Sequence, residues 1–380
     1  MATAQKLQTE ALVVEKAKDD FKLITVTVDP VLRSDEVLVE MKYSGVCHTD
    51  IVFQRGLVPT VKFPAIFGHE GAGVVKAVGS GVKDKSLHPG DFVLLSFNAC
   101  GKCVECSKGQ PARCHGHVEI NHTAKRPEDG STPTAMADDG RKVSSQFFGH
   151  SSFCRLSVVK EACIVKCPYP ESMAIFAPLG CGFQTGAGTI MNSFKATEKD
   201  SVVIFGLGSV GLTAVMAAAY LKVRQVIAVD LVPVKLKLAQ ELGATHTING
   251  KDTPDTVAEI KRITEGGANY AMDCTGVVKV IENAIECLSP CGSAAIVGVP
   301  AAGSRLQLDP LTFLLQNKRL IGTIEGDSVP SKFIPQLMEL HKTGNFPIDR
   351  LCKIYNVKDF HQALEDIEQG KVVKPIIQWS

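Results

Sequence analysis

The stretch VVIFGLGSVG, residues 202–211, joins a short apolar run to three regularly spaced glycines. The run VVIFG has the composition of a buried strand, and the residues after the glycines, TAVMAAAYLK, have that of a helix. At such a turn Gly206 permits a tight bend, Gly208 lets the backbone approach a pyrophosphate, and Gly211 lets the helix pack closely on the strand. The stretch predicts a dinucleotide site in a doubly wound α/β sheet. A glycine-rich turn without a ligand is the alternative.

Asp230 ends the next apolar run, VIAVD at residues 226–230. A carboxylate there would accept hydrogen bonds from both hydroxyls of a ribose and would repel a 2′-phosphate. The position therefore predicts NAD and disfavours NADP. Lys235, in the helical stretch that follows, could reach the adenosine ribose; a solvated lysine on a helix surface is the alternative.

The two halves of the chain have different patterns. From about residue 185, apolar strand-like runs alternate with helical stretches, which is typical of a parallel doubly wound sheet. The first half has short β-branched runs broken by glycine, proline and aspartate, as in a mostly β domain. Residues 117–146 are polar and predict a long surface loop. At the C-terminus we expect amphipathic helices near residues 332–344 and 359–370, and a strand in KPIIQW.

The charge is balanced, because 41 Lys and Arg side chains oppose 40 Asp and Glu side chains, for a net charge of +1. No long-range field favours a nucleic acid or a membrane surface, so a small molecule is the expected ligand. The N-terminal residues lack the apolar core and cleavage site of a secretory signal, and no run reaches the roughly 18 apolar residues of a membrane span. A cytoplasmic protein is expected, and a length of 380 residues favours two domains.

Four of the 13 cysteines fall in CGKCVECSKGQPARC, with the spacing C-x2-C-x2-C-x7-C. They are Cys100, Cys103, Cys106 and Cys114. Disulfides are not expected in a reducing cytosol, whereas four such thiolates suit a closed tetrahedral zinc site. In the bacterial iron–sulfur pattern the last cysteine follows three residues and precedes a proline, which Cys114 does not match. Unligated loop cysteines are the other alternative. The spacing predicts a structural zinc site without an open position for a substrate.

Two further cysteines lie in short polar or glycine-rich motifs outside this loop. Cys47 opens CHTDIV at residues 47–52, and Cys181 lies in GCGFQTGAG. His69 stands in the tripeptide GHE. A lone histidine of this kind is more often a satisfied core residue. The two unassigned cysteines favour a second metal site instead.

The sequence around His69 carries a family resemblance. Gly68, His69, Glu70, Gly73, Gly79 and Val82 follow the pattern GHE-x2-G-x5-G-x2-V, by which the chain resembles the zinc-containing medium-chain alcohol dehydrogenases. The four-cysteine loop and the glycine fingerprint follow in the family's order, so the similarity spans essentially the whole chain. It implies a GroES-like, mostly β catalytic domain at residues 1–184 and 325–380 and a Rossmann cofactor domain at residues 185–324. It also implies reversible hydride transfer from an alcohol to NAD, with one catalytic and one structural zinc.

The resemblance assigns roles around the catalytic zinc. Cys47, His69 and Cys181 would ligate it, with the fourth position open for alcohol or water. Asp50 would orient His69, and Glu70 would lie behind the metal. Plain surface charges are the alternative for both acids.

Proton release departs from the family's usual pattern. Thr49 would take the alcohol proton and pass it to the nicotinamide ribose. In many relatives a histidine five residues after the first cysteine ligand then receives it, but here that position is Val52. His48 stands where many relatives carry an arginine against the pyrophosphate. It is expected to contact that phosphate, either alone or with a part in proton release.

Further positions follow from the same resemblance. On the cofactor side it places Ser209, Val210, Cys274, Val299 and Lys374, of which Lys374 would face the pyrophosphate. A surface lysine is the alternative for Lys374, and simple packing also explains Cys274. The alcohol channel would be lined by Thr49, Phe97, Val299 and Ile324.

The segments PLGCGFQTGAG and IEGDSVPSKFIPQLMELHKTGNFPIDRL look most like those of aryl-alcohol dehydrogenases in this family. The expected substrates are therefore aromatic or allylic primary alcohols. A glutathione-dependent formaldehyde dehydrogenase or a general aliphatic alcohol dehydrogenase is the nearer alternative, and a non-catalytic dinucleotide-binding protein the more distant one. A homodimer is expected, with a tetramer as the alternative.

Overall fold

A computed structural model describes residues 5–379 of the chain. The chain divides into two compact units. One comprises Met1–Cys181, Val329–Met338 and Asp349–Ser380, and the other comprises Gly182–Ser328 and Glu339–Ile348. The sequence-based boundaries at residues 184 and 324 lie within a few residues of the unit boundaries. The second unit also takes in Glu339–Ile348, which the prediction had placed in the catalytic domain.

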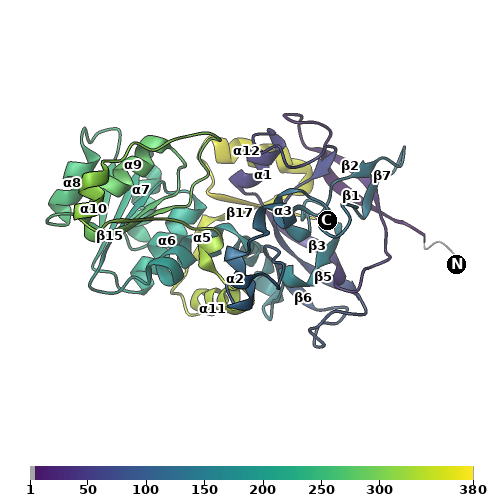
Figure 1. Ribbon diagram of the computed structural model, residues 1–380. Helices are drawn as coiled ribbons and strands as arrows, with labels where there is room; N and C mark the ends of the chain where they lie inside the picture. The colour runs from purple at the N-terminus through teal and green to yellow at the C-terminus, as the bar shows by residue number, and fades with distance from the viewer. Residues whose placement is uncertain (1–4, 380) are drawn as a thin grey trace. The chain divides into compact units, whose positions relative to one another are not determined.

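The second unit is built on a six-stranded sheet in which all neighbouring strands are parallel (Figure 1). Its strands are β11 (Ser201–Phe205), β12 (Gln225–Asp230), β13 (His246–Asn249), β14 (Ala268–Asp273), β15 (Leu288–Ile296) and β16 (Arg319–Gly322). The strand order is β13-β12-β11-β14-β15-β16. The chain adds strands outward from β11 on one side and then from β14 on the other, as in a doubly wound dinucleotide fold. Every residue of the central strand β11 is buried, which explains its continuous apolar run.

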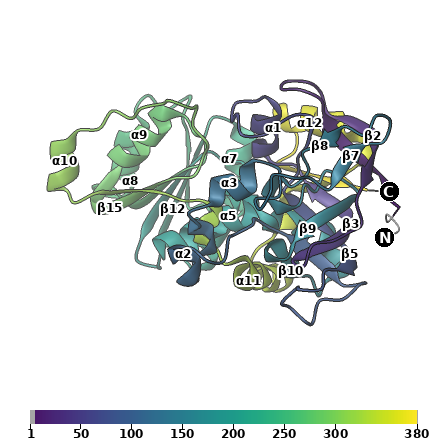
Figure 2. The same cartoon turned by 45° about the vertical axis from the view of Figure 1, so that its right-hand side comes forward.

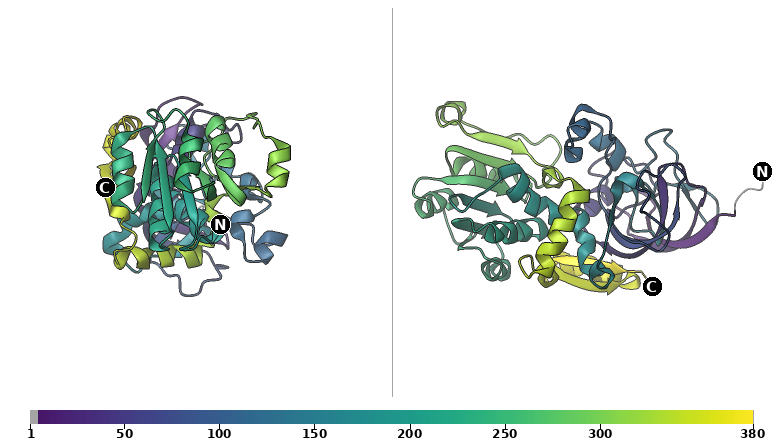
Figure 3. Two further views of the ribbon diagram at one scale, coloured as in Figure 1. Left: turned by 90° about the vertical axis from the view of Figure 1, so that its left-hand side faces the viewer. Right: turned by 90° about the horizontal axis from the view of Figure 1, so that it is seen from below.

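Helices cover both faces of this sheet, as the left view of Figure 3 shows. They include α5 (Gly182–Gly188), α6 (Ser209–Tyr220), α7 (Pro233–Glu241), α8 (Thr256–Ile263), α9 (Val278–Glu286) and α10 (Pro310–Leu315). The predicted alternation of strands and helices is confirmed. Helix α10, on the chain between β15 and β16, is drawn at the left edge of Figure 2, and its Phe313 packs against the core that also contains Ile281 and Ile285 of α9.

The first unit contains two sheets that are mostly antiparallel. The five-stranded sheet has the order β4-β1-β2-β7-β8, with β1 (Leu7–Val14), β2 (Lys22–Val28), β4 (Ala65–Ile66), β7 (Thr134–Met136) and β8 (Lys142–Val143). The seven-stranded sheet has the order β10-β6-β5-β3-β18-β17, with β9 also paired to β3. Its strands are β3 (Glu36–Gly45), β5 (Glu70–Val78), β6 (Phe92–Leu95), β9 (Leu156–Lys160), β10 (Ile164–Lys166), β17 (Cys352–Asn356) and β18 (Lys374–Gln378). The expected C-terminal strand is β18, which pairs antiparallel with β3.

Short helices connect these strands: α1 (His48–Gln54), α2 (Val104–Ser107), α3 (His117–His122), α4 (Met173–Phe176) and α12 (Phe360–Glu368). Helix α11 (Pro330–Lys342) begins in the first unit and ends in the second. The two amphipathic helices expected near the C-terminus are therefore present as α11 and α12. No helix within residues 5–379 has the length and hydrophobicity needed to span a bilayer.

The prediction of a long surface loop at residues 117–146 is wrong. This segment contains α3, β7 and β8, and β7 extends the five-stranded sheet by pairing with β2. The segment is anchored by Arg126, whose guanidinium donates to both carboxylate oxygens of the fully buried Glu36, at 2.6 and 2.7 Å. Polar side chains look like loop residues in a sequence, but here a bidentate ion pair lets them enter the interior.

Candidate active site and metal centres

Four side chains of the first unit converge on one point. The sulfur atoms of Cys47 and Cys181, a ring nitrogen of His69 and a carboxylate oxygen of Glu70 lie within 4.8 Å of one another. Cys47 precedes α1, His69 directly precedes β5, and Cys181 follows the turn after α4. Ser96, just after β6, donates to the carbonyl oxygen of Gly180 at 2.6 Å and so ties the Cys181 segment to the sheet. Separate parts of the chain thus build one group of ligand atoms.

Asp50 fixes the orientation of the His69 ring. Its Oδ1 atom lies 2.9 Å from His69 Nδ1 and also accepts from the backbone nitrogen of Gly68 at 2.9 Å. Its Oδ2 atom accepts from the backbone nitrogen of Cys47 at 3.1 Å, at the start of α1. Because a carboxylate only accepts, Nδ1 carries the ring proton and Nε2 presents its lone pair. Nε2 is buried and has no hydrogen-bond partner among the described residues, as expected for an atom that ligates a metal.

Glu70 is held by a buried lysine. Lys374 Nζ lies 3.0 and 2.9 Å from the two carboxylate oxygens of Glu70 and donates to the carbonyl oxygen of Val46 at 3.1 Å. Lys374 is 1% exposed and Glu70 is fully buried. Burial lowers the pKa of Lys374, but the charge of Glu70 outweighs it and holds that pKa above its ordinary value.

This arrangement bears on the expectations for both residues. One carboxylate oxygen of Glu70 lies within 4.8 Å of the other three ligand atoms, and its expected place behind the metal stays a prediction. Lys374 is neither a surface lysine nor a free cation, so a pyrophosphate contact would require it to leave Glu70. A resemblance could place Lys374 near the site but could not show that a buried carboxylate would pair with it.

Cys47 and Thr49 lie side by side at the start of α1. The sulfur of Cys47 and the hydroxyl oxygen of Thr49 are 3.7 Å apart. A hydrogen bond with Cys181 is the largest cause that holds the pKa of Cys47 well below its ordinary value, and His69 acts in the same direction. The thiolate, which is the form that binds metals, is therefore favoured. Val52, at the position where a histidine was expected in relatives, is buried within the same helix.

The four cysteines of residues 100–114 form a second group, with all four sulfur atoms within 4.8 Å of one another. Sulfur atoms around a tetrahedral zinc, with Zn–S bonds of about 2.3 Å, lie about 3.8 Å apart. Cys100 and Cys106 are separated by 3.9 Å, in agreement with that geometry. Backbone nitrogens also contact the sulfurs: Cys103 N lies 3.3 Å from Cys100 Sγ, and Cys100 N lies 3.4 Å from Cys114 Sγ. The group fits a closed metal site and contains no residue of the first group.

The ligand-atom group of His69 is flanked by a cluster of aromatic rings that the sequence did not predict. Phe148 stacks on the His69 imidazole with 4.5 Å between ring centroids, and Phe147 contacts the same imidazole edge-on at 5.7 Å. His122 lies 5.5 Å from Phe148 and 5.1 Å from Phe53. These rings come from α1, α3 and the segment before β9. The dipeptide Phe147-Phe148 in QFFGHSSF has no metal-site spacing, so only the fold identifies it.

The residues expected to line an alcohol channel are found in different surroundings. Phe97 is 1% exposed and contacts the ring of His117, with 5.9 Å between centroids, so it does not face open solvent. Val299 and Ile324 belong to the second unit and are 56% and 49% exposed. Thr49 thus lies next to Cys47, and Phe97 contacts the His117 ring of α3. The alcohol channel itself stays a prediction.

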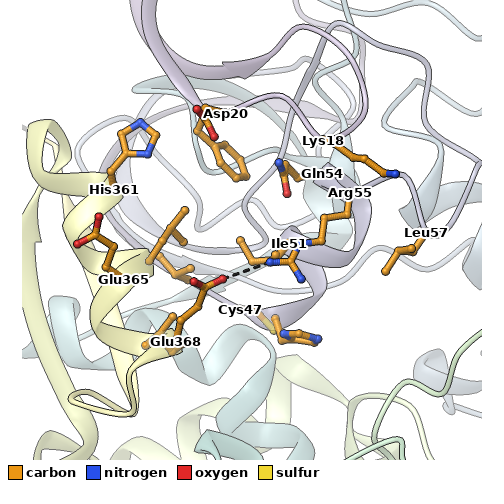
Figure 4. A pocket seen from close by; sticks show the side chains of 15 residues that line it. Lys18, Asp20, Cys47, Ile51, Gln54, Arg55, Leu57, His361, Glu365 and Glu368 are labelled. Atoms are coloured by element: carbon orange, nitrogen blue, oxygen red, sulfur yellow. Dashed lines mark hydrogen bonds and ion pairs between the residues drawn. The ribbon is translucent and has the colours of Figure 1, made fainter.

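His48 lies at a cavity of about 800 Å³ in the first unit, between α1 and α12 (Figure 4). Cys47 and Ile51 from the α1 side line it with His48, and His361 and Glu365 line it from α12. An ion pair of 3.2 Å between Arg55 and Glu368 joins the two helices. The exposed His48 is therefore free to meet an anion, as its predicted phosphate contact requires.

The glycine fingerprint has the geometry expected for a dinucleotide site. Gly206 has φ +88°, and a Cβ on Gly211 would come within 2.0 Å of the carbonyl oxygen of Gly206. A Cβ on Gly208 would meet no atom within 4 Å, so the space beside this residue is open to a ligand. Ser209 and Val210 form the first turn of α6, at whose N-terminus an anion is stabilised.

Asp230, at the end of β12, is organised by backbone donors. Its Oδ2 accepts from Leu207 N at 2.7 Å, and its Oδ1 accepts from Leu231 N and Val232 N. The remaining lone pairs can still accept from ribose hydroxyls. Lys235 lies in the first turn of α7, and the backbone nitrogen of Cys274, just after β14, donates to the carbonyl oxygen of Phe205. Both belong to the same unit as the fingerprint.

A parallel doubly wound unit joined to a mostly β unit with these two sulfur-rich groups defines a class: dehydrogenases that combine zinc with a nicotinamide dinucleotide. Residues 33–169 match the family of alcohol dehydrogenase GroES-like domains, and residues 209–343 match that of zinc-binding dehydrogenases. The chain is 39% identical over 345 residues to geraniol dehydrogenase of Castellaniella defragrans, covering 91% of each chain.

Two solved structures share this fold over their full length. An alcohol dehydrogenase zinc-binding domain protein from Burkholderia ambifaria has a TM-score of 0.94 at 40% identity, with 98% of this chain and 99% of that one covered. Benzyl alcohol dehydrogenase from Acinetobacter calcoaceticus has a TM-score of 0.92 at 38% identity, with 98% and 100% covered. The chain belongs to the zinc-dependent alcohol dehydrogenase family, and it is an oxidoreductase with zinc and NAD as cofactors.

Proposed function

We propose that this enzyme oxidises aromatic or allylic primary alcohols to aldehydes. The observation that carries the proposal is the set of rings beside the His69 group, with Phe148 stacked directly on the ligand imidazole. Flat, apolar walls next to a polar metal group suit an alcohol with a planar conjugated body. The names of the relatives from Castellaniella defragrans and Acinetobacter calcoaceticus, geraniol and benzyl alcohol dehydrogenase, also support this substrate class.

Cys47, His69 and Cys181 are the proposed ligands of the catalytic zinc, and the cysteines of residues 100–114 those of the structural zinc. When bound, the catalytic zinc supplies Lewis-acid stabilisation of the alcohol oxygen as it loses its proton. Asp50 holds the His69 tautomer, and the Glu70–Lys374 pair places a compensated carboxylate beside the metal. Thr49, beside Cys47, is positioned to hold the hydroxyl proton of the alcohol.

The proton then needs a route that does not use position 52, because a buried valine cannot accept it. His48 is exposed and precedes Thr49 on the same helix. We assign it contact with the cofactor phosphate, with a share in proton release as the further hypothesis. Val52→His tests the route: a relay that limits the enzyme would change the pH–rate profile, whereas an unchanged profile contradicts such a limit.

The cofactor side of the proposal rests on the second unit. Gly206, Gly208 and Gly211 with Ser209 and Val210 would hold the pyrophosphate, and Asp230 would hold the adenosine ribose. Lys235, Cys274 and Val299 are proposed to lie along the dinucleotide. Preference for NAD over NADP follows from the charge of Asp230, so Asp230→Ala should reduce the discrimination against NADP.

A homodimer is the proposed assembly, and the cytoplasm the proposed compartment. Strand β16 is an edge of the six-stranded sheet, and α10, which precedes it in sequence, exposes Leu311, Leu314 and Leu315 by 63–75%. An open strand edge next to exposed leucines is a surface that proteins usually cover. Light scattering on the wild type and Leu315→Lys would test it; a monomeric wild type contradicts the dimer.

Initial rates of NAD reduction on zinc-loaded enzyme test the substrate class. Burial of a ring contributes about 1.5–3 kcal/mol, so kcat/KM for benzyl alcohol should exceed that for ethanol by about 10- to 100-fold. Geraniol serves as the allylic comparison and NADP as the cofactor control. Equal values for ethanol, or activity confined to hydroxymethylglutathione, would overturn the substrate assignment and leave the family assignment unchanged.

A further inference from the structure

The aromatic cluster beside the metal group contains two imidazoles that the chemistry above does not use. His117 and His122 both belong to α3, and their rings lie 5.7 Å apart, edge to face. The ring of His122 contacts Phe148, and Phe148 in turn stacks on His69. The ring centroid of His117 lies 6.3 Å from that of the same Phe148. The remaining rings around them, Phe53, Phe97 and Phe147, are apolar and at most 3% exposed.

The side chain of Asn121 is fully used by backbone groups and leaves the His117 ring unpaired. Asn121 Oδ1 accepts from the backbone nitrogen of Asn98 at 2.8 Å, and Asn121 Nδ2 donates its two hydrogens to the carbonyl oxygens of Asn98 and His117, at 3.0 and 2.9 Å. His117 Nδ1 lies farther from that nitrogen, at 3.4 Å, so no hydrogen remains for it. The ring of His117 therefore keeps one donor and one acceptor for another group, although His117 is only 6% exposed.

His122 offers a second polar edge in the same place. Its backbone carbonyl accepts from the hydroxyl of Thr60 at 2.7 Å, but no ring nitrogen of His122 bonds to a side chain or backbone group among residues 5–379. Burial lowers the pKa of His117 and of His122 to about 4. At neutral pH both rings are neutral, so each has one donor and one acceptor.

We propose that His117 and His122 are specificity-determining residues that select aromatic alcohols carrying an oxygen substituent on the ring, with a phenolic hydroxyl preferred. This inference rests on the proposed aryl-alcohol function and names the substituent that the pocket recognises. The ring N–H of His117 donates to the substituent oxygen, and the acceptor nitrogen of His122 accepts a hydrogen bond from the phenolic hydroxyl. A methoxy group can use only the first of these hydrogen bonds, and an unsubstituted ring leaves both imidazoles unsatisfied in an apolar wall, which is costly.

The test is a ratio of kcat/KM values within one enzyme. For the wild type, the better of 3- and 4-hydroxybenzyl alcohol should exceed benzyl alcohol by about tenfold, with the matching methoxybenzyl alcohol between them. In His117→Leu and in His122→Phe this ratio should fall to about twofold or less. His88→Leu is the matched control, because His88 is exposed and lies outside the ring cluster, and its ratio should equal that of the wild type.

The outcomes separate this inference from the proposed function. Benzyl alcohol preferred over ethanol, with no gain from a ring oxygen in the wild type, overturns the inference and keeps the aryl-alcohol function. Benzyl alcohol no better than ethanol overturns the aryl-alcohol function itself. A wild-type preference that survives in both variants also overturns the inference. The wild-type ratio needs no variant, so the inference can fail even where a substitution prevents folding, and His117→Gln adds a polar variant of similar size.

Discussion

The two groups of candidate metal ligands in this enzyme are built in opposite ways. The four-cysteine group comes from residues 100–114 alone, and its sulfurs are contacted by backbone nitrogens of the same loop. The Cys47–His69–Cys181 group comes from three distant segments and is surrounded by buried charges, namely Asp50, Glu70 and Lys374. A local loop can close around an ion by itself, whereas the second group forms only when the segments after β3, before β5 and after α4 have come together.

The surroundings decide what each group can do. Four thiolates complete the coordination of a zinc ion and leave nothing for a substrate. Two thiolates and an imidazole would leave one position open on a zinc ion, and the rings of Phe147 and Phe148 lie beside that imidazole, His69. We therefore expect changes at the first group to affect stability and changes at the second to affect chemistry.

The largest expected effect is on activity. His69→Ala removes a proposed ligand and the Lewis acid with it, which contributes several kcal/mol, so kcat/KM should fall by at least about a thousandfold. The four-cysteine group should keep its zinc, so metal analysis should show about one ion per chain lost. The exposed His88→Ala is the control. Retention of more than a tenth of the activity would contradict the assignment of His69.

Cys106→Ser should act on stability instead. Loss of a structural zinc removes folding free energy, and Tm should fall by about 10 °C or more. At low temperature the surviving folded enzyme should keep its KM for benzyl alcohol. Cys291→Ser is the matched control, because Cys291 is exposed and belongs to neither group. An unchanged Tm with zinc lost would show that this loop does not hold the fold.

Lys374→Met leaves Glu70 buried without its cation. Removing one partner of a buried pair is expected to lower the free energy of unfolding by about 3–5 kcal/mol. Lys353→Met breaks the ion pair with Asp366, but Lys353 is 57% exposed, so its effect should stay within about 1 kcal/mol. Urea unfolding measures both. Equal effects for the two lysines would contradict the buried pair.

Asp50→Asn removes the charge that orients His69 but keeps the side-chain shape. Loss of such a partner typically weakens metal binding by about 10- to 100-fold. Competition with a chelator should therefore release one zinc per chain more readily, while the zinc of the four-cysteine group resists as in the wild type. If both ions are lost together, the two groups are coupled and the contrast between them is wrong.

Acid should lower the free energy of unfolding through protonation of His122, which lies in the ring cluster beside the Cys47–His69–Cys181 group. Its pKa is lowered to about 4 by burial, below the unfolded value of about 6.5, so the unfolded state binds more protons between these values. The contribution of neutral His122 to the free energy of unfolding is fully present above pH 6.5. It falls as the pH drops towards 4, with a loss of about 2 kcal/mol at pH 5. His122→Phe should flatten the dependence of Tm on pH in this window, and an identical slope would contradict the burial of a neutral ring.

Several features could be predicted from the sequence because they depend on neighbours along the chain. The strand–glycine–helix pattern at residues 202–220 and the spacing of Cys100, Cys103, Cys106 and Cys114 each concern short segments. The convergence of Cys47, His69 and Cys181 could be named only through the family resemblance. The polar stretch at residues 117–146 was misjudged, because the bidentate pair of Arg126 and Glu36 that lets it enter the interior joins residues far apart in the sequence.

The sequence by itself thus determined the two kinds of domain, the dinucleotide turn and the closed four-cysteine group, since local periodicity and spacing are sufficient for each. Only the tertiary structure decided that Lys374 lies buried against Glu70 and that Phe148 stacks on His69. It also brought His117 and His122 into the same wall as Phe148. The physical reason is that burial, pairing of charges and ring packing are properties of contacts between distant segments, and no local pattern records them.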